Sequence, residues 1–256
     1  ALNSFMMHAT RFVGPALAGW VVAVTGEALC FLLNAASYLA VLLALLAIRL
    51  PASGPRKASA PPLQALREGV RYTAGQRNIR ASLLLIASLS FLATPYTVLM
   101  PLFAREIFGG DARLFGLLMG CAGAGALSGA VLLALRSDTA GLAALIGRVA
   151  PLVGIALALF AVSTNLWLTV PILFGLGLAL LLCVAGSNTL IQTQVDNDFR
   201  GRVMSLFTMA FLGIAPLGSF AVGSLAHVFG VRSTLIACGL LTAAAGLIYR
   251  RSLPTR

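Results

Sequence analysis

The feature that most constrains the fold of this chain is the length of its uncharged runs. Residues 149–195 contain no Asp, Glu, Lys or Arg, a run about twice as long as the roughly 20 apolar residues that one helix needs to cross a bilayer. The polar patch Ser163-Thr164-Asn165 near its middle indicates a turn between two spans. Six other apolar stretches are each predicted to form one span: residues 12–26, 28–48, 81–104, 114–135, 203–226 and 233–249. The sequence therefore predicts an all-α, polytopic membrane protein with eight transmembrane helices in this chain.

The charged residues support this topology. Only 10% of the residues are charged and 59% are hydrophobic, whereas about a quarter of the residues in a typical soluble domain are charged. If the chain starts in the cytoplasm and crosses at every span, 15 of the 18 basic residues are cytoplasmic, and the exceptions are Arg105, Arg113 and Arg232. Both ends of this chain are then cytoplasmic. The net charge of +11 is explained by this topology and by attraction to the lipid bilayer, and it does not predict nucleic-acid binding.

A charged stretch at residues 49–80 separates the first two predicted spans from the other six. Its first part, PASGPRKASAPPLQ, has the proline, alanine and serine content of a linker. Its second part places Leu63, Leu66, Val70 and Tyr72 at roughly helical spacing with arginines on other faces, which predicts a short helix on the cytoplasmic membrane surface. We therefore expect residues 1–48, a cytoplasmic linker at 49–80 and residues 81–256 to be separate parts.

A glycine pattern in the first predicted span recurs in the seventh. The spacing is repeated 204 residues later, and the two sets are Gly14, Gly19 and Gly26, then Gly218, Gly223 and Gly230. A short outer turn and one last span follow each set, so the chain reads as two repeats, the first of which lacks the counterparts of four spans. We expect a protein of twelve helices in two six-helix halves, in which this chain forms about the carboxyl-terminal two thirds.

Two segments carry a resemblance to a known family. ALNSFMMHATRFVGPALAGWVVAVTGEALCFLLNAASYLAVLLAL and DNDFRGRVMSLFTMAFLGIAPLGSFAVGSLAHVFG resemble the fifth-to-sixth and tenth-to-eleventh helix regions of the major facilitator superfamily. Within it they resemble the bacterial exporter branch that includes the enterobactin exporter and macrolide-efflux-type proteins. The resemblance implies helices 5–12 of the twelve-helix fold. Residues 1–48 are then the last two helices of the first bundle, residues 81–256 are the second bundle with a short cytoplasmic tail, and the missing N-terminal helices of the same chain are a partner.

The resemblance also implies a function. It implies a secondary active transporter of the bacterial inner membrane that exports small amphipathic molecules, siderophore or drug-like, by alternating access and in antiport with protons. All seven acidic residues lie at or beyond the ends of predicted spans, so the proton-coupling carboxylate is expected in the missing helices. The chain is not expected to be an enzyme, and neither a catalytic residue nor a cofactor is predicted.

Uncharged polar residues inside the spans are the candidate contacts to a small-molecule substrate. They lie around the proline of the third span and near the cytoplasmic end of the sixth, and one arginine at the entrance of the first span joins them: Ser90, Thr94, Tyr96, Thr97, Ser187, Asn188, Gln192 and Arg11. The alternative is that the hydroxyls bond their own helix, the amides tie helices together, and the arginine only anchors the topology. The residues expected to serve gating or packing are Gly14, Pro15, Gly19, Pro95, Gly218 and Gly223.

Two other classes of function stay open at the level of the sequence. An intramembrane enzyme or a non-transporting membrane scaffold is the alternative to a transporter. His8 and His227 lie at span ends without a second ligand at helical spacing, and the four cysteines lie far apart in apolar runs. No metal site is therefore predicted.

Overall fold

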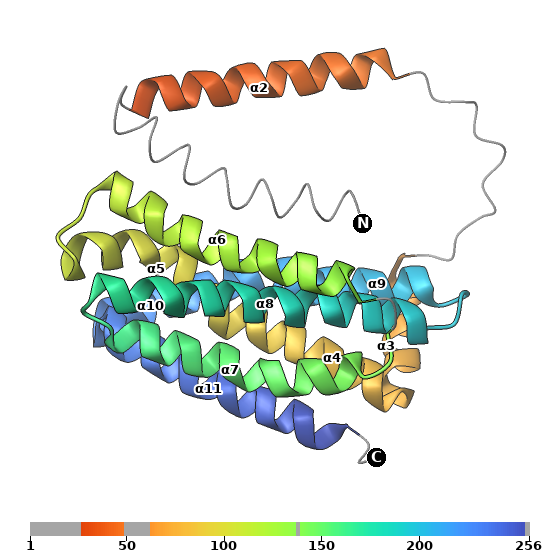
Figure 1. Cartoon of the computed structure of the whole chain (residues 1–256). Coiled ribbons are helices and arrows are strands. Elements are labelled where there is room, and N and C mark those ends of the chain that lie inside the picture. Colours follow the sequence, from red (N-terminus) through yellow and green to blue (C-terminus); the bar gives the residue numbers. More distant parts are fainter. Residues whose placement is uncertain (1–26, 49–61, 137–138, 254–256) are drawn as a thin grey trace.

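A computed structural model describes residues 27–48, 62–136 and 139–253 of the chain, and within these ranges all regular structure is helical (Figure 1). The α-helices are α2 (Glu27–Ala47), α3 (Pro62–Gly75), α4 (Arg77–Ser88), α5 (Tyr96–Leu102), α6 (Ala112–Ala134), α7 (Leu142–Val162), α8 (Leu166–Gln194), α9 (Arg200–Thr208), α10 (Ala215–Phe229) and α11 (Val231–Ser252). Three π-helices complete the order: η1 (Leu89–Ala93), η2 (Phe103–Ile107) and η3 (Met209–Gly213).

Six helices among the described residues are long and apolar enough to cross a membrane. Two of them are composite: Arg77–Ile107 contains α4, η1, α5 and η2, and Arg200–Phe229 contains α9, η3 and α10. The predicted turn between the fifth and sixth spans is confirmed, because α7 ends at Val162 and α8 begins at Leu166. The linker predicted for residues 49–80 contains α3, and α4 begins inside it at Arg77.

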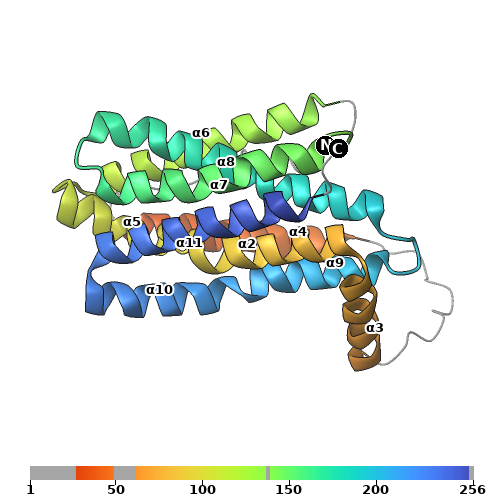
Figure 2. The same cartoon turned by 90° about the horizontal axis from the view of Figure 1, so that it is seen from below.

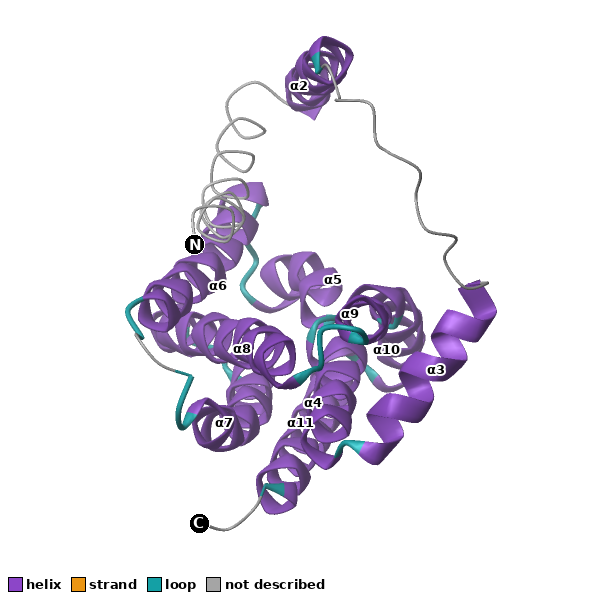
Figure 3. Cartoon of the chain, turned by 90° about the vertical axis from the view of Figure 1, so that its right-hand side faces the viewer, coloured by secondary structure: helices purple, strands orange, loops and turns teal. Residues whose placement is uncertain are grey.

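Eight spans are predicted from the sequence, whereas six helices among the described residues are long and apolar enough to cross a membrane. The first predicted span, at residues 12–26, lies outside the described residues. The second coincides with α2, of which Leu32–Ala47 forms an apolar stretch. Figures 1 and 3 show α2 standing apart from the other helices, and all of its described side chains are exposed.

Residues 77–253 form a bundle in which segments distant in sequence lie side by side. The largest interfaces pair α7 with α11 and α6 with α8. Glycines allow the backbones to approach: a Cβ on Gly154 of α7 would lie 2.7 Å from the Cα of Ala243 on α11, and one on Gly177 of α8 would lie 3.1 Å from the Cα of Ala122 on α6. Small residues of this kind let membrane helices gain contact area where no hydrophobic effect drives association.

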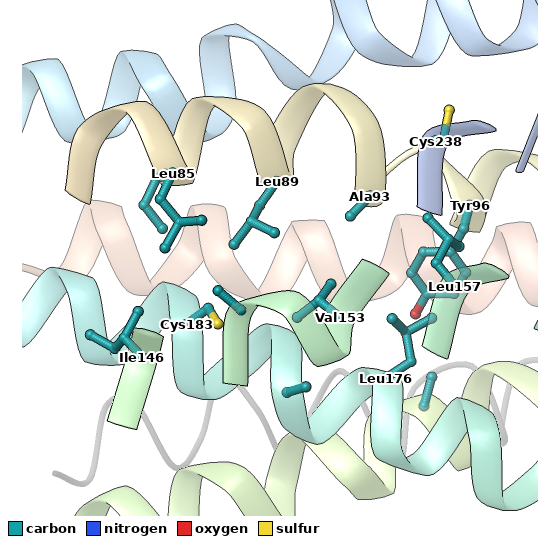
Figure 4. Close-up of a cluster of buried hydrophobic side chains, with 14 of the residues drawn as sticks. Leu85, Leu89, Ala93, Tyr96, Ile146, Val153, Leu157, Leu176, Cys183 and Cys238 are labelled. Atoms are coloured by element: carbon teal, nitrogen blue, oxygen red, sulfur yellow. The ribbon is translucent and has the colours of Figure 1, made fainter. Parts of the chain in front are cut away.

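The core of the bundle is apolar and includes buried residues from all six described spans. Figure 4 shows Leu85 of α4 and Leu89 of η1 facing Val153 of α7 and Leu176 of α8, all of which are buried. Aromatic rings fill one end of the core, where Phe103 and Phe160 lie 4.4 Å apart between ring centroids. This packing fixes the positions of α4, η1 and α5, which carry several of the predicted site residues.

Arginines gather at one end of the bundle, which we call the arginine-rich end. There α4 and α9 begin and α11 ends, with Arg77, Arg80, Arg200, Arg202, Arg250 and Arg251. Helix α3 lies at the same end and runs across the bundle, whereas the six spans run along it (Figures 2 and 3). The helix predicted for this part of the linker is therefore present, and it packs against α9.

Candidate functional site

Two of the six spans are interrupted by π-helical turns, and the two interruptions are in contact. In η1 the amide of Thr94 donates to the carbonyl of Leu89, and in η3 the amide of Ile214 donates to that of Met209, each five residues back. Each π-helix is followed closely by a proline, Pro95 or Pro216, which has no N–H with which to continue the α-helical ladder. Residues of η1 and η3 contact each other, so the breaks form one junction between two spans. Such π-turns are frequent at functional sites.

A buried serine joins the two spans at this junction. Pro216 cannot donate to the carbonyl of Phe211, which lies five residues before it and which a π-helical bond would reach. The Oγ of Ser90 donates to this carbonyl at 2.5 Å, and Ser90 has no exposed surface. The hydroxyl therefore supplies a donor to a backbone carbonyl to which Pro216 cannot donate, in a place where an unpaired carbonyl would be costly.

Close backbone contact reinforces the same junction. Gly218 of α10 lies against Phe91 of η1, and a Cβ on this glycine would lie 2.7 Å from the Cα of Phe91. A side chain larger than hydrogen would meet backbone atoms there, so the approach of α10 to η1 depends on glycine. The hydrogen bond of Ser90 and the close approach of Gly218 thus both hold the two interrupted spans together.

The other residues predicted around Pro95 make contacts within the bundle. The hydroxyls of Thr94 and Thr97 donate to carbonyls of their own span, at Leu89 (3.3 Å) and Thr94 (3.0 Å). Tyr96 is buried, and its ring meets that of Phe160 edge to face with centroids 6.4 Å apart. Both threonines are partly exposed, so they are the members of this set whose side chains reach the bundle surface.

The residues predicted on α8 form a second group. The amide of Gln192 donates to Oδ1 of Asn188, one turn earlier on the same face. Gln192 is exposed and Asn188 partly exposed, whereas Ser187 is fully buried and its hydroxyl has no partner among the described residues. No hydrogen bond between described residues joins this pair to the residues around Pro95.

An open groove of about 570 Å³ runs along α10, and the sequence did not single out most of its lining. In the described part of the chain it is lined by Ser219, Phe220, Gly223, Ser224, His227 and Val228. These residues form three pairs of neighbours that recur every four positions, the spacing of one helical face, which is the signal that could have marked them. Gly223, predicted for gating or packing, has open space where a Cβ would be.

The remaining predicted residues, Arg11, Gly14, Pro15 and Gly19, lie outside the described residues. Inside the six described spans the single acidic residue is Glu106, which is exposed in the last turn of its span. No group of three His, Cys, Asp or Glu side chains that could hold a metal ion occurs in the described ranges. The junction and the α8 pair therefore offer hydrogen bonds and apolar contact rather than charge.

Six apolar spans in the described part of the chain, two of them interrupted, are characteristic of a multi-pass membrane protein. Interrupted helices often form the substrate sites of transporters. The whole chain, residues 1–256, matches the family described as transmembrane secretion effector, and it belongs to that family. The resemblance to exporters of the major facilitator superfamily is thereby confirmed, and the chain is a multi-pass bacterial membrane protein.

Three relatives describe the similarity. The chain is 27% identical over 251 residues to the staphyloferrin A transporter of Staphylococcus aureus, covering 97% of this chain and 62% of that protein. It is 25% identical over 259 residues to the multidrug efflux pump Tap of Mycobacterium tuberculosis, covering 95% and 58%. It is 27% identical over 268 residues to the MFS-type transporter YfiS of Bacillus subtilis, which is uncharacterized, covering 97% and 61%. The chain thus spans about three fifths of the length of these relatives.

Proposed function

We propose that this chain supplies helices 5–12 of a twelve-helix secondary transporter that exports small amphipathic molecules, siderophore or drug-like, by alternating access. The observation that carries this proposal is the match of the entire chain to the transmembrane secretion effector family. The names of two relatives give the substrate classes, a siderophore for one and multiple drugs for the other. Eight helices of twelve are two thirds of such a fold, which is close to the 62% and 58% of these two relatives that the chain covers.

The exposure of the predicted site residues divides them into residues that line the cavity and residues that position the helices. Asn188 and Gln192 keep polar atoms at the bundle surface, and Thr94 and Thr97 are partly exposed. In our proposal these four side chains line the substrate cavity, and Arg11 draws anionic substrates toward it. Ser90, Tyr96 and Ser187 are buried, so we assign them to positioning the helices around the cavity.

The junction of η1 and η3 supplies the flexibility that alternating access needs. A span interrupted by a π-turn and a proline can bend more easily than a continuous α-helix. We propose that Pro95 and Gly218, with Gly14, Pro15 and Gly19 in the fifth helix, serve the bending and close packing that accompany the change of access. Gly223 borders the open groove on α10, and in our proposal it serves gating by making this helix easier to bend.

The orientation in the bacterial inner membrane follows from the arginines. The arginine-rich end carries most of the basic residues of the bundle, and cytoplasmic loops hold such an excess. We therefore place this end, with both ends of the chain and the linker at 49–80, in the cytoplasm. Proton antiport would need a titratable group inside the membrane, which we place in helices beyond this chain.

Efflux measurements test the proposal. The full-length protein is reconstituted in proteoliposomes, and the export of an iron-free siderophore and of ethidium is followed. Each compound is measured with an imposed proton gradient and again after an ionophore has collapsed the gradient. We expect gradient-dependent movement of at least one compound. If neither compound moves in either condition, the protein is not an exporter of these classes and a scaffold becomes the better interpretation.

A pair of matched variants tests the proposed cavity. Replacing both Asn188 and Gln192 by Leu removes the amide pair from one face of α8. Loss of two hydrogen bonds to a substrate, each contributing about 0.5–1.5 kcal/mol, lowers efflux by about tenfold. The control is Gln194→Leu, an exposed amide two residues further along and on another face of α8, which should leave efflux unchanged. Equal losses in both variants would contradict a cavity on the 188–192 face.

A further inference from the structure

Helix α3 is held on the bundle by one of its faces. The ring of Tyr72 stacks on that of Phe199 with centroids 4.4 Å apart and planes 11° apart, and its hydroxyl donates to Oδ2 of Asp196 at 3.0 Å. Glu68 forms an ion pair of 3.1 Å with Arg202 of α9. These contacts attach α3 to the beginning of α9 and to the loop before it. The opposite face of α3 is thereby fixed in its orientation.

That opposite face is apolar along one edge and cationic along the next. Leu63 and Val70, seven residues apart and so on the same side of the helix, are 77% and 51% exposed. Arg67 and Arg71 are exposed beside them. We call these four residues the outer face of α3. Exposure of two large aliphatic side chains next to two arginines is typical of helices that lie in a membrane interface, with the apolar edge in the acyl boundary and the cations among headgroups.

The position of α3 fits the same environment. Figures 2 and 3 show the helix crossing the bundle at its arginine-rich end, level with the ends of the spans. Because the spans run along the membrane normal, a helix that crosses them at their ends lies parallel to the membrane surface. The outer face thus lies at the depth of the headgroups and points away from the bundle.

The charge of this region favours anionic lipid. Arg77 and Arg80 follow Arg67 and Arg71 within fourteen residues, and the acid among them, Glu68, is paired with α9. Arg67 and Arg71 lie on α3, and Arg77 and Arg80 lie at the start of the span that follows it. Basic clusters on an amphipathic helix or beside the end of a spanning helix attract anionic headgroups, with a gain of about fivefold in association per residue. We propose that the outer face of α3 is a binding surface for the anionic lipids of the bilayer. The proposal does not depend on transport activity.

Quenching of a single tryptophan by brominated lipids tests this proposal. The full-length protein carries Leu63→Trp in nanodiscs of phosphatidylcholine with one quarter of the lipid replaced by brominated phosphatidylglycerol or by brominated phosphatidylcholine. Trp20, Trp167 and any tryptophan of the helices beyond this chain are replaced by Phe, so that the reporter is the single tryptophan. We expect quenching about twofold or more stronger with the brominated phosphatidylglycerol, because the arginines enrich it around the reporter. Replacing Arg67 and Arg71 by Gln should bring the ratio close to one.

Matched controls separate this surface from a general effect of charge. Replacing Arg105 and Arg113 by Gln removes two exposed arginines at the opposite end of the bundle and should leave the ratio at position 63 unchanged. Where the double glutamine variant folds poorly, salt replaces it: 0.5 M NaCl screens headgroup attraction and should lower the ratio in the parent. Equal quenching by the two lipids in the parent, no response to Arg67 and Arg71 or to salt, or no quenching by either lipid would overturn the proposal.

Discussion

Alanine in place of Gly218 should weaken the packing of α10 on η1. A Cβ there would lie 2.7 Å from the Cα and 2.9 Å from the carbonyl carbon of Phe91, and these backbone atoms cannot rotate away as a side-chain end could. Forcing an extra carbon into such a contact costs about 1–3 kcal/mol. Alanine also favours a helix over glycine by about 0.5–1 kcal/mol, which partly hides the steric cost when Gly218→Ala is compared with the parent.

Gly223 on the same helix supplies the matched control. A Cβ at this position meets nothing within 4 Å, so Gly223→Ala has the helical gain without the clash. The free energy of unfolding should be lower in Gly218→Ala than in Gly223→Ala by about 1–3 kcal/mol, or roughly 5- to 140-fold in the unfolding equilibrium. The measurement is SDS titration of the protein in dodecylmaltoside, followed by circular dichroism. Equal midpoints for the two variants would refute the close approach at Phe91.

Three further predictions concern the junction, α3 and the topology. Ser90→Ala should lower the free energy of unfolding by about 1 kcal/mol, because a buried carbonyl loses its donor. Ser88→Ala loses only a bond within its own helix and should lower the free energy of unfolding less in the same titration. A larger loss for Ser88→Ala than for Ser90→Ala would refute the junction. Tyr72→Phe should leave α3 docked through ring stacking, whereas Tyr72→Leu should release it. Backbone hydrogen exchange in α3 should therefore be faster in the leucine variant alone. Unchanged exchange in both variants would show that the stack does not hold the helix. Reporter fusions at Thr164 and Gly141 should give periplasmic and cytoplasmic signals respectively, and the opposite result would invert the proposed orientation.

The existence of the spans could be predicted from the sequence because the signal is local. A run of uncharged apolar residues of bilayer length marks a helix whatever packs against it, and the ends of α6 and α11 lie within two or three residues of the predicted limits. The polar patch at Ser163 marked the end of α7 for the same reason. Basic residues predict in the same local way which helix ends are cytoplasmic, and the reporter fusions at Thr164 and Gly141 test that orientation.

The pairing of the spans could not be predicted, because it depends on surfaces that meet only in the fold. Gly125 of α6 lies against the backbone of Phe174 on α8, and the approach of Gly154 to α11 joins segments some 85 residues apart. Tyr72 was placed with the apolar side chains of its helix. It lies instead on the bundle side of α3, because its hydroxyl donates to Asp196, which is in a loop 124 residues away in the sequence.

The candidate site shows the same limit. The bend near Pro95 could be expected from proline chemistry alone. The role of Ser90 could not, because its acceptor is a backbone carbonyl on another span, 121 residues away in the sequence. A side chain that serves a distant peptide group leaves no pattern of its own in the sequence.

The π-turns also change how the two interrupted spans should be compared between relatives. A π-turn holds one residue more than an α-turn, so the side chains after it are rotated by about 100° from the faces that a single helical wheel predicts. Deleting one residue within 209–213 would restore a regular helix and rotate Gly218 away from Phe91, although every apolar residue of the span would remain. A one-residue alignment gap in η1 or η3 therefore marks a change in which side chains face the bundle.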